Sequence, residues 1–141
     1  MNIAIIDGQG GGLGKSIIGK LKIELCEKIK IIALGTNPQA AKAMIKAGAD
    51  EGFYGENLIV KYLEEASLDC IVAPIGVLCS GGINGEVTYK ISKAVVNKEC
   101  IKYIIPLKKH GFYIPGTTTL ELKDIIHEII EEIKKYQESA S

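Results

Sequence analysis

The N-terminal segment of the chain constrains its fold more than any other feature. Residues 3–16 read Ile-Ala-Ile-Ile-Asp-Gly-Gln-Gly-Gly-Gly-Leu-Gly-Lys-Ser, so a short apolar run is followed by five glycines within seven positions and then by a helix-forming stretch. A loop without Cβ atoms lets backbone N–H groups approach a ligand, and the N-terminus of the following helix favours negative charge. The segment therefore predicts a strand–loop–helix unit that binds the phosphate of a nucleotide-type ligand.

Short apolar strands alternate with helices along the rest of the chain. This alternation is typical of a parallel sheet that is covered by helices on both faces. We therefore predict a single α/β domain over residues 1–137, a Rossmann-like doubly wound three-layer sandwich with about five main parallel strands, and a disordered tail at residues 138–141. The predicted strands are Ile3–Ile6, Lys30–Leu34, Cys70–Ala73 and Ile101–Ile105, with very short strands at Gly52–Tyr54 and Phe112–Ile114; the predicted helices are Gly14–Leu25, Gln39–Ala47, Asn57–Ala66, Asn84–Val96 and Leu120–Tyr136.

The composition narrows the classes of partner and site. Seventeen basic residues balance seventeen acidic ones, so the net charge indicates neither a nucleic-acid nor a membrane partner. All seventeen basic residues are Lys, which excludes an Arg clamp on a phosphate. The four cysteines (Cys26, Cys70, Cys79 and Cys100) form no C-x-x-C pair, so no metal site is predicted. Without a leader peptide or a membrane helix, the chain is expected to be cytoplasmic, and a domain this small is expected to form a homodimer.

The spacing of the glycines fits one of the dinucleotide-binding loops better than the other. The strict G-x-G-x-x-G pattern fails, because its third glycine would fall on Leu13 or Lys15. The looser G-x-x-x-G-x-G pattern of short-chain dehydrogenases fits Gly8, Gly12 and Gly14. The loop therefore favours a Rossmann-like dinucleotide site.

The P-loop, G-x-x-x-x-G-K-[ST], is the competing motif. Gly14-Lys15-Ser16 supplies its end, but Gln9 stands where its first glycine belongs. No second buried strand ends in the Asp that would hold magnesium. A diverged P-loop ATPase is therefore an alternative, as is a glycine-rich turn that only packs a helix against a strand.

Six short motifs along the chain resemble one uncharacterised bacterial family. They are Ile-Asp-Gly-Gln-Gly-Gly-Gly-Leu-Gly-Lys near the N-terminus, Ala-Leu-Gly-Thr-Asn at 33–37, Ala-Gly-Ala-Asp at 47–50, Gly-Glu-Asn at 55–57, Pro-Ile-Gly at 74–76 and Gly-Glu-Val-Thr at 85–88. The chain is similar over nearly its whole length to the domain of unknown function number 3842. The resemblance implies a small Rossmann-like protein and implies no activity.

The fold places the expected site beyond the carboxyl ends of the strands, where the strand order reverses. NADP is favoured slightly over NAD as the cofactor, because Thr36 and Asn37 follow the second strand where an NAD site usually has an acid. Asp7 is expected mainly to tie down the loop, with a hydrogen bond to a ligand as the alternative. A regulatory nucleotide-binding module without catalysis is the main alternative to an enzyme. The predicted cofactor-binding residues are Asp7, Gly8, Gln9, Gly10, Gly11, Gly12, Leu13, Gly14, Lys15, Gly35, Thr36, Asn37, Pro74, Ile75 and Gly76; on a possible substrate side are Glu56, Asn57, Asn84 and Glu86.

Overall fold

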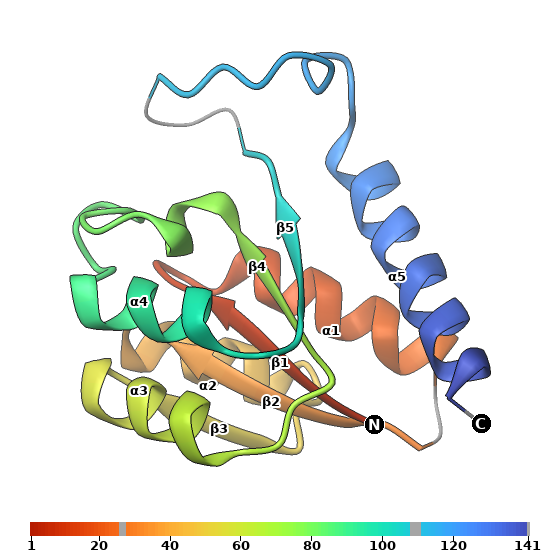
Figure 1. The fold of residues 1–141 in the computed structure, drawn as a ribbon, viewed down its shortest axis with the longest axis horizontal. Helices are drawn as coiled ribbons and strands as arrows, with labels where there is room; N and C mark the ends of the chain where they lie inside the picture. Colours follow the sequence, from red (N-terminus) through yellow and green to blue (C-terminus); the bar gives the residue numbers. More distant parts are fainter. Residues whose placement is uncertain (26–27, 108–110, 141) are drawn as a thin grey trace.

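Five strands and six helical segments form the structure, a computed structural model that describes residues 1–25, 28–107 and 111–140 (Figure 1). Cys26 and Ser141, which the sequence analysis considered, lie outside these residues. The strands are β1 (Asn2–Asp7), β2 (Lys30–Gly35), β3 (Glu51–Tyr54), β4 (Cys70–Pro74) and β5 (Ile101–Ile105). The helices are α1 (Gly12–Glu24), α2 (Pro38–Lys46), α3 (Glu56–Glu65), the short 3₁₀ helix η1 (Ile75–Leu78), α4 (Tyr89–Asn97) and α5 (Leu122–Ser139).

The strands form one parallel sheet in the order β3-β2-β1-β4-β5. The chain builds outward from β1 to β3 and then returns, so that β4 pairs with the free side of β1. The strand order therefore reverses between β1 and β4, and their carboxyl ends are neighbours. This arrangement confirms the predicted α/β fold with five parallel strands.

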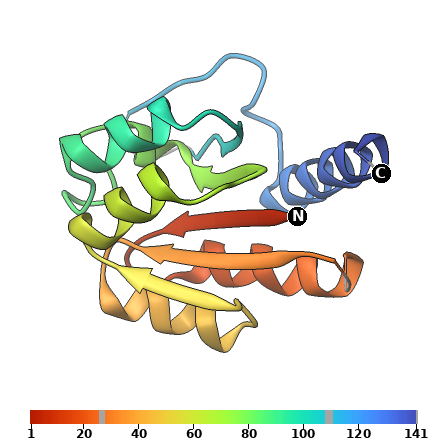
Figure 2. The same ribbon diagram turned by 60° about the horizontal axis from the view of Figure 1, so that its bottom comes forward.

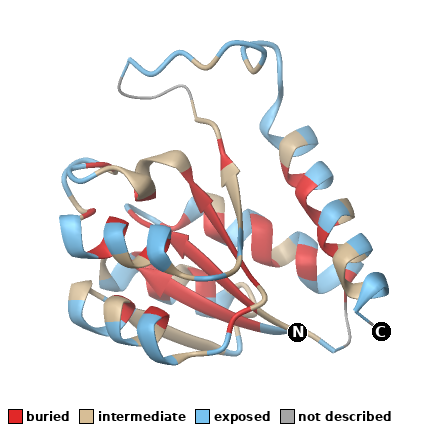
Figure 3. Cartoon of the chain, viewed as in Figure 1, coloured by how far each residue is buried: buried red, intermediate tan, exposed pale blue. Residues whose placement is uncertain are grey.

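Helices cover both faces of the sheet, because the central strands are apolar on both sides. Along β1, Ile3 and Ile5 join a core cluster with side chains of α1, α2 and α5, while Ala4 and Ile6 join a second cluster with side chains of α3 and α4. All four residues are 0% exposed. Figure 2 shows the two helical layers on opposite sides of the strands, and Figure 3 shows the buried residues concentrated in the strands and on the inner sides of the helices.

Local capping signals fix the starts of two helices. The Asn37 side chain accepts a hydrogen bond from the Ala40 N–H at 2.8 Å, and Pro38 occupies the first helical position of α2. Thr88 caps α4 in the same way, accepting from the Ile91 N–H at 3.3 Å.

The predicted helix over Asn84–Val96 is wrong at its start, since α4 begins at Tyr89. Ile83, Asn84 and Gly85 have φ angles of 52°, 52° and 84°. These left-handed values are incompatible with the first turn of a right-handed helix. Asn84 and Glu86 therefore lie in a loop that precedes the helix.

Two further predictions differ from the structure near the C-terminus. Phe112–Ile114 forms no strand, because this segment lies outside the sheet, where it has no neighbouring strand to pair with. Helix α5 extends to Ser139, two residues into the segment expected to be a disordered tail. Within the described ranges, no helix combines the length and the apolar character needed to cross a membrane.

Candidate functional site

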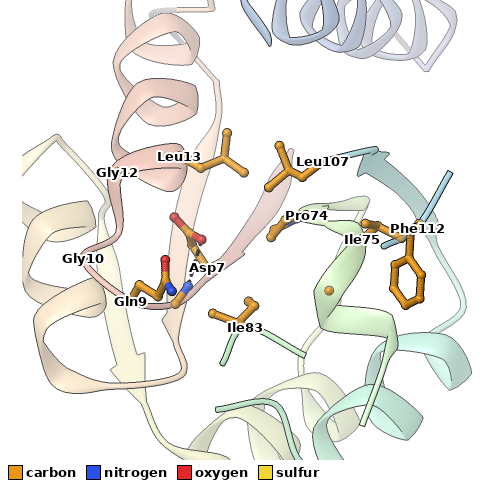
Figure 4. A pocket seen from close by; sticks show the side chains of 12 residues that line it. Asp7, Gln9, Gly10, Gly12, Leu13, Pro74, Ile75, Ile83, Leu107 and Phe112 are labelled. Carbon is orange, nitrogen blue, oxygen red and sulfur yellow. Dashed lines mark hydrogen bonds between the residues drawn. The ribbon is translucent and has the colours of Figure 1, made fainter. Parts of the chain in front are cut away.

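A cavity of about 260 Å³ opens where the strand order reverses, between the loop after β1 and the end of β4 (Figure 4). Its position is the one that doubly wound sheets use for ligands. The loop after β1 and the start of α1 form one side, and the end of β4 with η1 forms the other. The lining residues are Asp7, Gly8, Gln9, Gly10, Gly12, Leu13, Pro74, Ile75, Gly76, Ile83, Leu107 and Phe112.

Most of the loop residues that the sequence predicted for the site line the cavity, whereas the predicted residues around β2 and α3 do not. Ile83 and Phe112 were not predicted to belong to it. Leu107 follows β5 at the same edge of the sheet, which is a signal that the sequence offered, whereas the conformation that brings Ile83 to the cavity is not visible in the sequence. Predicted cofactor-binding residues outside the lining are Gly11, Gly14, Lys15, Gly35, Thr36 and Asn37, and Glu56, Asn57, Asn84 and Glu86 are also outside it.

Asp7 closes the base of the cavity and organises the loop around itself. One carboxylate oxygen accepts from the Gly8 N–H at 2.8 Å, and the other accepts from the Gly14 N–H at 2.7 Å. The side chain is only 6% exposed, so these bonds are made in a desolvated setting. Asp7 thus ties the first glycine to the first turn of α1, which is the structural role that the sequence favoured.

The five glycines of the loop fall into two groups. A Cβ atom at Gly11 would lie 2.8 Å from the Ala40 carbonyl oxygen, and φ there is +73°. A Cβ at Gly8 would overlap Thr36 Oγ1, and one at Gly14 would overlap Met44 Sδ. These three glycines are explained by packing and backbone conformation alone.

Gly10 and Gly12 have no such explanation. A Cβ atom at either position would meet nothing within 4 Å, and neither residue has a left-handed φ. Both line the cavity. Their missing side chains therefore leave open space at the point where a ligand would approach the backbone.

Three backbone N–H groups at this edge of the cavity have no hydrogen-bond acceptor among the described residues. Within the described part of the chain, the N–H groups of Gly10, Gly12 and Leu13 donate to no protein acceptor. The latter two belong to the first turn of α1, a helix of 13 residues that has no side-chain cap. Unpaired donors at a helix N-terminus form an anion-binding site.

The other walls of the cavity are apolar. In Figure 4, Leu13 from α1 and Leu107 after β5 lie on one side, with Pro74 and Ile83 nearby. Among the lining residues that the structure describes, Asp7 is the only one with an ionisable side chain. Lys15 is exposed and is not one of them, and the described donors at this end of the cavity are backbone N–H groups.

The tip of β2 is closed by a separate polar network. Glu86 Oε1 accepts from Thr36 Oγ1 at 2.6 Å, from Asn37 Nδ2 at 2.8 Å and from the Gln9 N–H at 3.0 Å. Burial raises the pKa of Glu86, but the hydrogen bonds from Thr36, Gln9 and Asn37 outweigh it and hold this pKa below its ordinary value. Thr36 and Asn37, which stand where an NAD site usually has an acid, therefore already donate hydrogen bonds to Glu86.

The remaining predicted residues lie away from the cavity. Glu56 and Asn57 begin α3, beyond the edge strand β3, and neither lines the cavity. Asn84 is exposed on the loop that carries Glu86.

Comparison with known proteins gives the family and supports the fold. The chain belongs to the family described as a domain of unknown function (DUF3842), whose model matches residues 2–138. No curated protein sequence matches it. Among solved structures, it is similar to a dodecameric FMN-dependent UbiX-like decarboxylase from Escherichia coli O157:H7, with 10% sequence identity and a TM-score of 0.52. That match covers 96% of this chain and 93% of the other, and at this identity it shows a shared fold.

Proposed function

We propose that this protein binds a mononucleotide that carries one phosphate ester and a flat ring, with FMN as the first candidate. The observation that carries the proposal is the trio of unpaired N–H groups at Gly10, Gly12 and Leu13, beside two glycines that leave room for a ligand. The phosphate would accept from these donors, and the ring would lie against the apolar walls of the cavity. The FMN dependence stated for the structurally similar decarboxylase supports the choice of a flavin.

A single nucleotide fits this cavity better than NADP or NAD, which the glycine spacing suggested. In a dinucleotide site the adenosine half lies over the tip of the second strand. Here Thr36 and Asn37 at that tip donate to Glu86 instead.

The P-loop alternative receives less support from the geometry. A P-loop uses its glycine N–H groups, Lys and Ser on phosphates and magnesium. Here the Gly14 N–H is bound by Asp7, and Ser16 Oγ donates to the Gly12 carbonyl oxygen at 3.1 Å. Strands β4 and β5 end in Pro74 and Ile105, so neither supplies an acid for a metal.

The cavity is equipped for binding more than for acid–base chemistry. Of the described lining residues, Asp7 alone has an ionisable side chain, and both of its oxygens already accept hydrogen bonds from the loop. A bound flavin would supply its own redox chemistry, while the chain would supply orientation and an apolar surrounding. A module that senses or carries such a ligand is compatible with the same geometry.

Titration calorimetry with FMN, riboflavin, NAD and NADP tests the proposal. We expect FMN to bind, and riboflavin, which lacks the phosphate, to bind at least ten-fold more weakly. Gly12→Val should reduce FMN affinity at least ten-fold, because the new side chain fills the space beside the unpaired donors.

Gly19→Val is the matched control, since Gly19 lies in the same helix, has open space at its Cβ position and does not line the cavity. This variant should bind FMN like the wild-type protein. Absence of FMN binding, or equal binding by the Gly12→Val variant, would overturn the proposal. Preferential binding of NAD or NADP would restore the dinucleotide interpretation.

We also propose that a second copy of the chain covers residues 112–122, giving the expected homodimer. Phe112, Tyr113, Leu120 and Leu122 are 46%, 74%, 48% and 40% exposed, which is unusual for four large apolar side chains so close in sequence. Sedimentation equilibrium should give twice 15.2 kDa for the wild-type protein, and Tyr113→Lys should shift it toward the monomer. A wild-type monomer at micromolar concentration would contradict this.

A further inference from the structure

Glu86 connects three loops that are far apart in the sequence. Its Oε1 atom accepts from the backbone of Gln9 after β1 and from the side chains of Thr36 and Asn37 after β2, at 2.6 to 3.0 Å. The Asn37 amide also donates to the Gln9 carbonyl oxygen at 2.9 Å. A single carboxylate oxygen therefore fastens the loop before α4 across the tips of β1 and β2.

The segment Gly81–Val87, here called the cover loop, has a closed shape of its own. The Gly81 N–H donates to the Val87 carbonyl at 2.7 Å, and the Val87 N–H donates to the Gly82 carbonyl at 3.0 Å. Between these bonds, Ile83 adopts a left-handed φ of 52°, which a β-branched residue rarely does. The cover loop is thus a preformed unit that holds Ile83 against the cavity.

The cover loop packs against the loop after β1, on the side toward the tip of β2 where the adenosine half of a dinucleotide usually lies. A Cβ atom at Gly8 would lie 2.7 Å from Ile83 Cγ2 and 2.9 Å from Glu86 Oε1, so this loop is in direct contact with the first glycine. The path from the loop after β1 toward the tip of β2 passes through that contact. A second phosphate there would also meet the negative charge of Glu86.

We infer that Glu86 is a specificity-determining residue: it holds the cover loop over the tip of β2 and limits the cavity to mononucleotides. This inference rests on the proposed function and adds the class of ligand that the site excludes. Glu86 acts here as a positioning residue, because its hydrogen bonds are to the protein and it does not line the cavity.

The test compares FMN with FAD, which contains the same flavin and phosphate and adds an adenosine monophosphate. The wild-type protein should bind FMN at least thirty-fold more tightly than FAD. In Glu86→Ala the cover loop loses its anchor, so this ratio should fall at least five-fold through tighter FAD binding, with FMN affinity changed less than three-fold. Glu86→Gln keeps an acceptor oxygen in the same place and should retain most of the selectivity.

Two further variants keep the test decisive. Glu65→Ala removes an exposed acid at the end of α3 and should leave the ratio unchanged. Thr36→Val removes the 2.6 Å hydrogen bond to Glu86 while keeping the shape of the side chain. It should therefore lower the FMN-to-FAD selectivity, as expected for Glu86→Ala, and it provides the test if Glu86→Ala does not fold.

The inference is overturned if the wild-type protein binds FAD as tightly as FMN. It is equally overturned if the folded Glu86→Ala variant, or the Thr36→Val variant in its place, has the wild-type ratio. Either result, with FMN still bound, leaves the proposed function standing. Absence of binding of both flavins by the wild-type protein would overturn the proposed function as well.

Discussion

The loop after β1 has two flanks that differ in how closely they are packed and in whether their backbone N–H groups have hydrogen-bond acceptors in the protein. On the flank toward β2, the Gln9 N–H donates to Glu86, and a Cβ at Gly8 would overlap its neighbours. On the other flank, Gly10 and Gly12 have open space at their Cβ positions, and in the described part of the chain their N–H groups have no acceptor. One short segment is therefore a packed structural element on one side and an open surface on the other.

This difference shows which glycines serve the fold and which leave room for a ligand. Where a glycine packs closely against backbone, that packing explains why no side chain is tolerated there. Where a glycine has open space around it and lies beside unpaired N–H donors, nothing in the protein itself explains the missing side chain. The sequence presents the five glycines as one motif, but the structure divides them. The following predictions test this division, beginning with the largest expected effect.

Gly11→Ala should lower the free energy of unfolding by about 2 to 4 kcal/mol, because it adds a Cβ at a left-handed φ and 2.8 Å from the Ala40 carbonyl oxygen. Urea denaturation gives the value. Gly12→Ala is the matched control and should change stability by less than about 1 kcal/mol, since nothing lies within 4 Å of its Cβ position. Equal losses of stability in the two variants would contradict the division of the glycines into those required by packing and those that leave room for a ligand.

Asp7→Asn should lower the free energy of unfolding by about 1 to 3 kcal/mol, since hydrogen bonds to a charged acceptor are stronger than those to a neutral one. The amide keeps one acceptor oxygen, so it cannot bind the N–H groups of Gly8 and Gly14 in the same way. Denaturation at pH 7 provides the measurement. The same variant should bind FMN more tightly, because it removes a negative charge from the cavity lining. Unchanged stability would show that Asp7 does not organise the loop.

The hydrogen bonds that Glu86 accepts on the flank toward β2 should stabilise the protein less at acidic pH. The pKa of Glu86 is lowered in the folded state, so its ionised form stabilises the protein above the ordinary Glu pKa of about 4.3, and this contribution is lost as pH falls through the folded-state value. Between pH 6 and pH 3, the free energy of unfolding of the wild-type protein should therefore fall more steeply than that of Glu86→Gln. If the free energies of unfolding of the two proteins fell in parallel with pH, the ionised carboxylate of Glu86 would not stabilise the folded state.

The smallest effect is expected at Lys15. Its side chain is exposed and lies outside the cavity lining, so Lys15→Ala should weaken FMN binding by no more than about three-fold, mainly at low salt. Titration at two salt concentrations would measure this. A loss of ten-fold or more would show that a lysine, and not the backbone alone, carries the phosphate.

The sequence by itself determined the layers of the fold and the place of the glycine loop between the first strand and the first helix. Apolar runs such as Ile3–Ile6 are long enough to be buried strands on both faces, and their alternation with helices requires a parallel sheet. Strand, glycine loop and helix follow one another directly, so the loop after β1 had to lie at the carboxyl edge of the sheet. These inferences depend on local patterns, and the structure has them as predicted.

Only the tertiary structure decided what surrounds that loop. Glu86 reaches Thr36 across 50 positions of sequence and Gln9 across 77, and no local pattern encodes such contacts. The left-handed turn at Ile83 also replaced the predicted start of a helix, because the cover loop is held by bonds within itself and by contact with Gly8. Local propensity decides where elements form, but the contacts that close the flank toward β2 and the open space beside Gly10 and Gly12 arise from long-range packing in the folded chain.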